Sequence, residues 1–382
     1  MTQKTFIPFY VPHIPQSTYK AITEVLKSGW ITTGPKVKIF EKRFGRTINS
    51  KSNIAVSSCT AALHLAYLAH KLDAGDEVIV PSFTFCSTIN TIIQVGATPV
   101  FCDIDEQTLC IDPKDIEKKI TKKTKAIIVV HYAGMPADLD TINNIASKNN
   151  LVVIEDAAHA FMTQYKGLYI GSGKNTTCFS FYATKNITTS EGGMITTQDK
   201  NISEYLQIMR MHGISKNASN RYDKKGDWFY DVITPGYKYN MTDIEAVIGI
   251  EQLKRVNEIV KRRKYLASIY KKFLIKNKNI TLPADVPYKE SQHAWHLFTI
   301  RIKDTAKITR NELIEKLKDA GIGTSVHFIP NHMQSYYKEH IGNVNLPITE
   351  KVFHEILSLP FYEDLTENQI KFVCDTLNYL TK

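Results

Sequence analysis

Short apolar strands alternate with amphipathic segments from about residue 53 to residue 160, and this alternation limits what the chain can fold into. Nearly continuous apolar strands that alternate with helices are typical of a mainly parallel sheet covered on both faces by helices. We therefore predict a three-layer α/β fold that binds ligands at the carboxyl ends of its strands. In chain order the segments are NIAVSS, TAALHLAYLAHKL, DEVIV, STINTIIQVG, TPVFCDI, PKDIEKKI, KAIIVVHYAG, DLDTINNIASKNN and LVVIEDAAHA.

The alternation stops after the strand-like runs TCFSFYA and GGMITT. Residues 241–273 are apolar along one stripe and predict one long helix that leads into a second domain. Beyond it, AWHLFTIRI and TSVHF resemble strands, RNELIEKLKDAG resembles a helix, and two further helices close the chain. Because 382 residues exceed one average domain, we expect a large α/β domain at residues 1–250 and a small α+β domain at residues 251–382.

The net charge of +10 favours an anionic ligand, although part of the excess lies on helical faces such as KRRKYLASIYKK at 261–272. No nucleic-acid recognition motif accompanies the charge, so a phosphorylated small molecule is the expected partner rather than nucleic acid. The segment GSGKNTT does not match a phosphate-binding P-loop, since Asn175 replaces the required Ser or Thr and Leu168 replaces the first glycine.

The cysteines and histidines predict no metal site. His293 and His296 are three residues apart but lack a third ligand, and the cysteines show no CxxC pair or zinc spacing. We find no signal-peptide pattern and no apolar run of the roughly 20 residues that span a bilayer. A cytoplasmic protein without a membrane segment is expected, with reduced core cysteines at Cys59, Cys86, Cys102, Cys110, Cys178 and Cys374.

Polar residues stand at the ends of two of the predicted strands. In LVVIEDAAHA an apolar strand leads into Glu155 and Asp156, which either meet a cation or act as a helix cap or surface acid. In AVSSCTAALH, Ser58 and Thr60 stand at a helix N-terminus, which is either an anion site or a plain N-cap.

Two further segments carry residues that could contact a ligand. In PSFTFCST, Phe83 or Phe85 could stack on a flat ring, although both could be core residues, and alternation allows only one to face a ligand. In FSFYATKNITTSEGGM, Lys185 follows an aromatic run and is either a solvated charge or a reactive amine.

An anion site, an acid, an aromatic ring and a lysine at the strand ends of one sheet match the needs of pyridoxal 5′-phosphate. The phosphate needs donors, the pyridine nitrogen needs a carboxylate, and the aldehyde needs an amine for a Schiff base. Lys185 supplies that amine, and desolvation beside a cationic ring lowers the pKa of a lysine and makes it nucleophilic.

The chain also resembles the DegT/DnrJ/EryC1/StrS family of fold-type-I, pyridoxal-phosphate-dependent sugar aminotransferases. The similar segments follow the family order over nearly the whole chain. They are GWITTGP, SSCTAALHL, GDEVIVPSFTF, TPVFCDID, VVHYAG, EDAAHA, FSFYATKNITTSEGGM, MRMHGISK, PGYKYNMTDIEAVIGIEQL and GIGTSVHFIP.

The resemblance implies a role for each matching residue. Lys185 would form the Schiff base and carry the proton, Asp156 would pair with the pyridinium nitrogen, and His159 would lie near the ring hydroxyl. The phosphate would be held by Ser58, Thr60, Ser180 and the backbone N–H of Cys59, which stands where many members have glycine. Phe85 would stack on the ring.

Three further residues carry predicted roles with alternatives. Asn240 resembles an asparagine that reaches the phosphate of the neighbouring subunit, which implies a homodimer with a shared active site, but it could also be a helix N-cap. His327 and His212 resemble substrate-side residues and could instead be a packed or a surface histidine.

The resemblance implies amino transfer from L-glutamate to a nucleotide-linked 4-keto-6-deoxyhexose, with C4 favoured by MRMHGISK and YNMTDIEA. The product would supply O-antigen, capsule, other glycans or antibiotic sugars. Three alternatives are a C3 aminotransferase, a pyridoxal-phosphate sugar dehydratase and a DNA-binding regulator. Lys185 and the lack of cluster-type cysteine spacing disfavour the dehydratase, and the lack of a DNA-binding motif disfavours the regulator.

Overall fold

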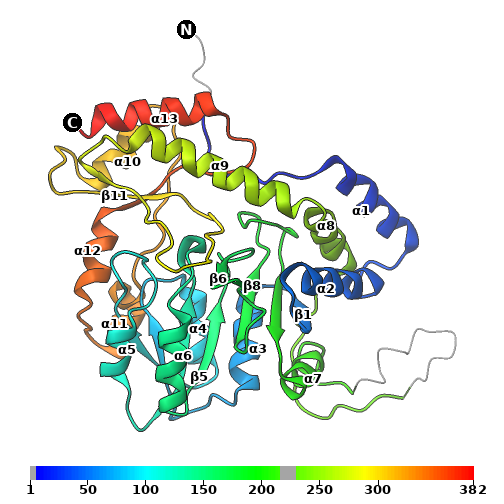
Figure 1. The fold of residues 1–382 in the computed structure, drawn as a ribbon. Helices are drawn as coiled ribbons and strands as arrows, with labels where there is room; N and C mark the ends of the chain where they lie inside the picture. Colours follow the sequence, from blue (N-terminus) through cyan, green and yellow to red (C-terminus); the bar gives the residue numbers. More distant parts are fainter. Residues whose placement is uncertain (1–5, 216–228) are drawn as a thin grey trace.

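The computed structural model describes residues 6–215 and 229–382 and is built around a seven-stranded sheet (Figure 1). The strand order is β1-β9-β8-β5-β4-β2-β3. The strands are β1 (Ser52–Val56), β2 (Glu77–Pro81), β3 (Thr98–Cys102), β4 (Thr124–Val130), β5 (Val152–Asp156), β8 (Thr176–Ser180) and β9 (Gly193–Thr197). The pairs β2–β3, β2–β4, β4–β5 and β5–β8 are parallel, whereas β9 is antiparallel to β1 and β8. The predicted, mainly parallel sheet is confirmed.

Helices cover both faces of this sheet, because its strands are apolar on both sides. Alternate strand residues such as Ile128 and Ile154 pack with α3 (Cys59–Ala69), α4 (Cys86–Gln94) and α7 (Lys200–Met209). The intervening residues, such as Ile127 and Val153, face the side covered by α2 (Pro35–Ile48), α5 (Pro113–Lys119), α6 (Leu139–Lys148) and α8 (Asp243–Leu253). The molecule therefore has the predicted three layers.

The predicted single helix over residues 241–273 is wrong, because the chain forms two helices there. A capping box of Thr242 and Glu245 begins α8, and α9 (Val256–Leu274) starts after a turn at Lys254 and Arg255. The two helices have different partners: α8 packs on α2 and on α1 (Gln16–Ser28), whereas α9 packs on α13 (Glu367–Leu380). A break lets each helix bury its own apolar side chains.

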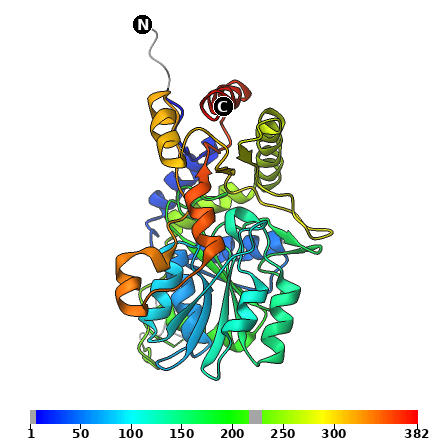
Figure 2. The same cartoon turned by 90° about the vertical axis from the view of Figure 1, so that its left-hand side faces the viewer.

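A second, antiparallel sheet consists of β10 (Ile280–Thr281), β11 (Thr299–Ile302) and β12 (Ile356–Ser358). It shares a core with α9, α10 (Arg310–Asp319) and α13, and Ile7 from the N-terminal segment joins this core. Figure 2 shows these elements above the seven-stranded sheet. The division between residues 250 and 251 would fall inside α8 and stays a prediction.

Other C-terminal elements pack against the large sheet. Tyr337 and Leu346 pack in the core on the side of α3 and α4, and Val352 packs in the core on the side of α5 and α6. These residues lie in or next to α11 (Ser335–Ile341) and α12 (Pro347–Glu355). The remaining short elements are the pair β6 (Gln164–Tyr165) and β7 (Leu168–Tyr169), and the 3₁₀ turns η1 (Tyr132–Gly134) and η3 (Asn331–Met333).

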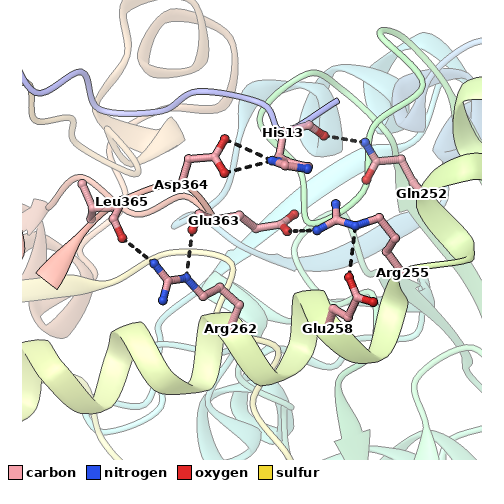
Figure 3. A network of polar contacts seen from close by, with 8 residues as sticks. All are labelled: His13, Gln252, Arg255, Glu258, Arg262, Glu363, Asp364 and Leu365. Carbon is pink, nitrogen blue, oxygen red and sulfur yellow. Dashed lines mark hydrogen bonds and ion pairs between the residues drawn. The ribbon is translucent and has the colours of Figure 1, made fainter. Parts of the chain in front are cut away.

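Polar contacts hold the turn between α8 and α9 against the N-terminal segment and the loop before α13 (Figure 3). The Gln252 side-chain amide donates to the backbone oxygen of His13 (2.8 Å), whose ring contacts Asp364 (2.9 Å). Arg255 pairs with Glu363 (3.1 Å). These contacts connect three distant parts of the chain at the place where the predicted long helix breaks.

Candidate active site

A cavity of about 530 Å³ lies at the carboxyl ends of the parallel strands. Loops after β1, β2, β5 and β8 line it, together with the N-terminal segment and residues from the C-terminal part of the chain. It brings together nine of the predicted site residues, which are Ser58, Cys59, Thr60, Phe85, Asp156, His159, Ser180, Lys185 and His327. These side chains therefore meet at the carboxyl ends of the strands, as predicted.

Lys185 lies in the turn that follows β8 and extends into this cavity. Burial lowers the pKa of its amine to about 8, although the negative charge of Asp156 opposes this shift. Tyr10 holds the backbone by donating its hydroxyl hydrogen to the Lys185 carbonyl oxygen (3.0 Å). About a tenth of the amine is therefore neutral, and nucleophilic, at pH 7, far more than for a lysine with the ordinary pKa of about 10.4.

Asp156 is the last residue of β5 and is only 5% exposed. Thr88 donates a hydrogen bond to Oδ2 (2.8 Å), and the backbone N–H of Ala158 donates to Oδ1 (3.1 Å). Burial raises the pKa of the carboxyl group, whereas both hydrogen bonds lower it. A buried carboxylate without a fixed cation is costly, so the site is suited to a cationic group of a ligand.

Glu155 faces away from the cavity. Its carboxylate contacts Nε2 of His131 (2.9 Å) and accepts a hydrogen bond from Asn175 (2.8 Å). Successive strand residues point to opposite sides, so only one of the two acids can face the ligand. The structure selects Asp156, and the alternative of a helix cap fails because the residues after β5 form turns rather than a helix.

His159 is a neutral hydrogen-bond donor. The backbone N–H of Ala133 donates to Nδ1 (3.2 Å), so the ring proton is on Nε2. Burial lowers the pKa of His159 well below its usual value, and the charge of Lys185 adds to this effect. The ring packs 4.3 Å from that of His296, measured between centroids, and both line the cavity.

The segment between β1 and α3 offers the donors that an anion site needs. Ser58 is the N-cap of α3, and its Oγ accepts a hydrogen bond from the N–H of Ala61 (3.0 Å). The N–H groups of Cys59 and Thr60 lie in the first helical turn, where no preceding helical carbonyl is available to accept from them. The plain N-cap alternative therefore holds for Ser58, and it is compatible with an anion bound at the free N–H groups, which stays a prediction.

Phe85 rather than Phe83 reaches the cavity. The Phe85 side chain is 58% exposed and lines the cavity, whereas Phe83 is 1% exposed and packs 5.1 Å from Tyr132. His327 also lines the cavity, where its Nδ1 contacts Ser358 Oγ (2.9 Å) and burial lowers the pKa of its ring to about 4.

Two predicted residues lie outside the cavity lining. His212 is exposed in the segment after α7, and its backbone N–H donates to Tyr237. Asn240 donates to Thr33 Oγ1 (2.5 Å). The alternative that made Asn240 a helix cap is wrong, because Thr242 caps α8.

Several cavity residues were not predicted. Tyr10 carries no local motif, Phe328 lies in the segment GIGTSVHFIP without a role of its own, and His296 becomes interpretable only through its partner Asn186. Thr88 does not line the cavity and becomes interpretable only through its hydrogen bond to Asp156. The sequence pattern singles out His296 only as a metal-ligand candidate, and it lacks a third ligand. Within residues 6–215 and 229–382, no three His, Cys, Asp or Glu side chains group as a metal site would require.

The residues of the cavity fit pyridoxal 5′-phosphate. Hydroxyl groups and a helix N-terminus suit the phosphate, a buried carboxylate suits the pyridinium nitrogen, and a neutral imidazole N–H suits the ring oxygen. Lys185 offers a partly neutral amine for the aldehyde. No group in this set conflicts with the charges of the cofactor.

Relatives with known sequences match the chain over its whole length. The family model for DegT/DnrJ/EryC1/StrS aminotransferases matches residues 12–378. The spore coat polysaccharide biosynthesis protein SpsC of Bacillus subtilis is 44% identical over 388 residues, which cover 100% of this chain and 99% of the relative.

Solved structures agree with this match. A putative sugar aminotransferase from Streptococcus pneumoniae, in its PMP form, is 33% identical with a TM-score of 0.93, over 98% of this chain and 99% of that one. The same protein in its PLP form gives a TM-score of 0.92. Helicobacter pylori PseC, an aminotransferase, is 26% identical with a TM-score of 0.91, over 99% of both chains. The chain therefore belongs to the DegT/DnrJ/EryC1/StrS aminotransferase family and is a pyridoxal-phosphate-dependent sugar aminotransferase.

Proposed function

We propose that the enzyme moves an amino group from L-glutamate to a nucleotide-linked 4-keto-6-deoxyhexose, with C4 as the favoured position. The observation that carries this proposal is the convergence of Lys185, Asp156, His159 and the α3 N-terminus on one cavity. When bound there, pyridoxal phosphate supplies an electron sink for bonds to the carbon that carries the amine.

Lys185 acts as the proton carrier in this proposal. Its Nζ takes up the proton from the α-carbon of the amino donor in the first half-reaction and delivers a proton to the sugar carbon in the second. A pKa of about 8 suits both directions, because the amine gains and loses a proton at little cost near neutral pH.

The other residues bind and orient. The Asp156 carboxylate pairs with the ring nitrogen, Nε2–H of His159 donates to the ring oxygen, and Phe85 covers one face of the ring. Ser58, Thr60, Ser180 and the N–H of Cys59 hold the phosphate. His327 and His212 are the proposed sugar-side residues, and only His327 lines the cavity of this single chain.

The substrate class is supported by charge and by the named relatives. A net charge of +10 attracts a nucleotide diphosphate. SpsC acts in spore coat polysaccharide biosynthesis, and PseC acts in the biosynthesis of pseudoaminic acid. We accordingly propose that the product enters a surface polysaccharide such as O-antigen or capsule, or a related glycan.

We further propose a homodimer in which Asn240 reaches the phosphate site of the partner. Large apolar side chains are exposed near Asn240, including Trp30 and Ile31 in the segment that Asn240 contacts through Thr33. Phe229, Val232 and other exposed apolar residues lie in the segment that leads to Asn240. Such a surface is suited to burial against a second copy.

A cytoplasmic location and two domains, divided near residue 250, complete this proposal. All six cysteines lie in described residues, and none forms a disulfide, as expected in a reducing compartment. Separately, the described helices include none with the length and apolar character needed to cross a membrane.

The first test is the visible absorbance of the purified protein with pyridoxal phosphate, before and after L-glutamate. Wild-type protein should develop a visible band that L-glutamate bleaches. Lys185→Ala should lack the lysine-dependent band and lose more than about 10⁴-fold in turnover, since the proton carrier is gone. The control Lys174→Ala removes an exposed lysine and should behave as wild type.

Nucleotide-linked 3-keto and 4-keto sugars then serve as acceptors, and NMR of the product locates the new amine. A wild-type protein that forms no band, or a Lys185→Ala variant that still turns over, would contradict the proposed role of Lys185. Bleaching by other amino acids but not L-glutamate would overturn the donor alone.

A further inference from the structure

The 3₁₀ turn η3 clamps the loop that follows β2. Asn331 donates to the Ser82 carbonyl oxygen from its backbone N–H (2.9 Å) and from its side-chain amide (3.0 Å). The same amide donates to the Thr84 carbonyl oxygen (2.8 Å). The backbone N–H of His332 donates to Ser82 Oγ (3.0 Å), which also contacts Nδ1 of the His332 ring (2.7 Å). We call Asn331 and His332 the brace.

These hydrogen bonds are inaccessible to water. Asn331 and Ser82 are completely buried, and Thr84 and His332 are nearly so. Buried hydrogen bonds meet little competition from solvent, and an unpaired group left behind by a deletion is costly. The brace therefore fixes the backbone at residues 82–84 from a segment that is about 250 residues away along the chain.

The clamped loop is connected to two side chains that line the cavity, Phe85 and Asp156. Phe85 follows Thr84 and is the N-cap of α4. Thr84 Oγ1 contacts Thr88 Oγ1 (3.0 Å), and Thr88 donates to Oδ2 of Asp156 (2.8 Å). The brace thus holds the backbone of Thr84, and the Thr84 side chain is connected by hydrogen bonds through Thr88 to the buried carboxylate.

We propose that Asn331 and His332 are positioning residues for the cofactor. They set the position of Phe85 against the ring face and the orientation of the Thr88 hydroxyl toward Asp156. This inference rests on the proposed function, which places Phe85 and Asp156 against the pyridine ring. Neither brace residue lines the cavity, so their effect is carried by the loop and by α4.

The test compares Ser82→Ala and Asn331→Ala with the matched control Thr349→Val, each as the purified full chain titrated with pyridoxal phosphate to the holoenzyme. Ser82→Ala removes only the hydroxyl that both brace contacts to Ser82 Oγ use. Thr349 is another fully buried residue of the C-terminal part, and its hydroxyl donates to Asp103 just after β3 rather than to the loop. The control therefore reports on general loss of a buried hydrogen bond.

Three readouts report on the cofactor: its Kd by titration, its visible circular dichroism and the pH midpoint of its visible band. We expect Ser82→Ala and Asn331→Ala to weaken cofactor binding about 10-fold, because each removes two buried hydrogen bonds that hold the loop. Both should also change the visible circular dichroism and move the pH midpoint, because the ring and Asp156 are realigned. Thr349→Val should leave all three as in wild type.

Wild-type values in both Ser82→Ala and Asn331→Ala, or equal changes in Thr349→Val, would overturn the proposed positioning role of the brace. If Asn331→Ala does not fold, Ser82→Ala and His332→Gln decide the matter with the same readouts. Phe85→Ala and Thr88→Val separate this inference from the proposed function. Unchanged readouts in those two variants would refute the assignment of Phe85 and Asp156 to the ring, whereas changes there but not in the brace variants would refute the brace alone.

Discussion

Burial determines the chemistry of single residues in the cavity. It lowers the pKa of Lys185 to about 8 and that of His327 to about 4, and it keeps His159 neutral. The same burial raises the pKa of Asp156, and the hydrogen bonds from Thr88 and Ala158 oppose this rise. The cavity thus combines neutral imidazoles with an amine that titrates near physiological pH.

The pKa of Lys185 predicts how cofactor capture by the apoenzyme depends on pH. Only the neutral amine attacks the aldehyde, and burial favours that form. The rate should rise about 10-fold per pH unit below pH 8 and level off above it, since the pKa is lowered to about 8. Stopped-flow absorbance after mixing with pyridoxal phosphate measures this rate.

An Nα-acetylated lysine amide is the control, because it reports the ionisation of the cofactor itself. Its rate should keep rising toward the ordinary lysine pKa of about 10.4. An apoenzyme rate that follows the same course would show that Lys185 behaves as a solvated lysine, which was the alternative that its sequence context allowed.

The residues of the site were partly predictable. Lys185, Asp156 and Ser58 follow strands, and strand ends are readable from apolar runs. Strand alternation alone does not choose between Glu155 and Asp156, because it does not say which side holds the cavity, and the prediction of Asp156 came from the family resemblance. Tyr10 and His296 come from distant segments, so no local pattern could identify them.

At the scale of elements, the β1–α3 loop depends on a close approach by β9. An ideal Cβ built on Gly193, the first residue of β9, would lie 2.5 Å from the Ser58 carbonyl oxygen and 2.8 Å from the Cys59 nitrogen. Both atoms belong to the backbone, which cannot rotate away as a side chain can. Because glycine has no Cβ, β9 can lie this close to the backbone of Ser58 and Cys59, where the anion site is proposed.

Gly193→Ala should therefore displace the anion site. We expect cofactor binding at least about 10-fold weaker, together with a loss of stability of about 1–3 kcal/mol from overpacking. Cofactor titration and thermal unfolding of the apoenzyme measure the two effects.

Gly173→Ala is the matched control, since a Cβ on Gly173 meets nothing within 4 Å. It should bind the cofactor as wild type does. If Gly193→Ala lowers stability but leaves the cofactor Kd unchanged, the loop does not depend on this close approach.

The two helices α8 and α9 illustrate how tertiary contacts override a continuous helical pattern. Residues 241–273 contain no proline, and their apolar stripe gives no local reason for a break. The turn at Lys254 and Arg255 arises because α8 is packed on α1 and α2 while α9 is packed on α13. Packing energy from two separate cores outweighs the small gain from one continuous helix.

For the whole molecule, the proposed shared active site predicts complementation between two defective variants. Lys185→Ala lacks the amine of its own site, and Asn240→Ala would damage the site of its partner. After mixing and subunit exchange, about half of the dimers are mixed, and each mixed dimer has one intact site. Activity should recover to about a quarter of wild type, because one in four sites is intact.

The outcome distinguishes action between subunits from action within one. If Asn240 serves its own chain, every site in the mixture carries one lesion and activity stays at the sum of the two parents. Each variant incubated alone is the control for subunit exchange, and sedimentation measures whether the dimer forms at all.

The sequence by itself determined the α/β class, the sheet edge that carries the ligand, and the positions of Lys185, Asp156 and the α3 N-terminus. These follow from local periodicity, since strand and helix periods and the residues at strand ends lie within short windows. Only the tertiary structure decided which side chains share the cavity, where residues 241–273 break, and how Asn331 holds the backbone at Ser82 and Thr84. Those features depend on contacts between segments far apart in the chain, and such contacts form through the packing of whole elements rather than through any local pattern.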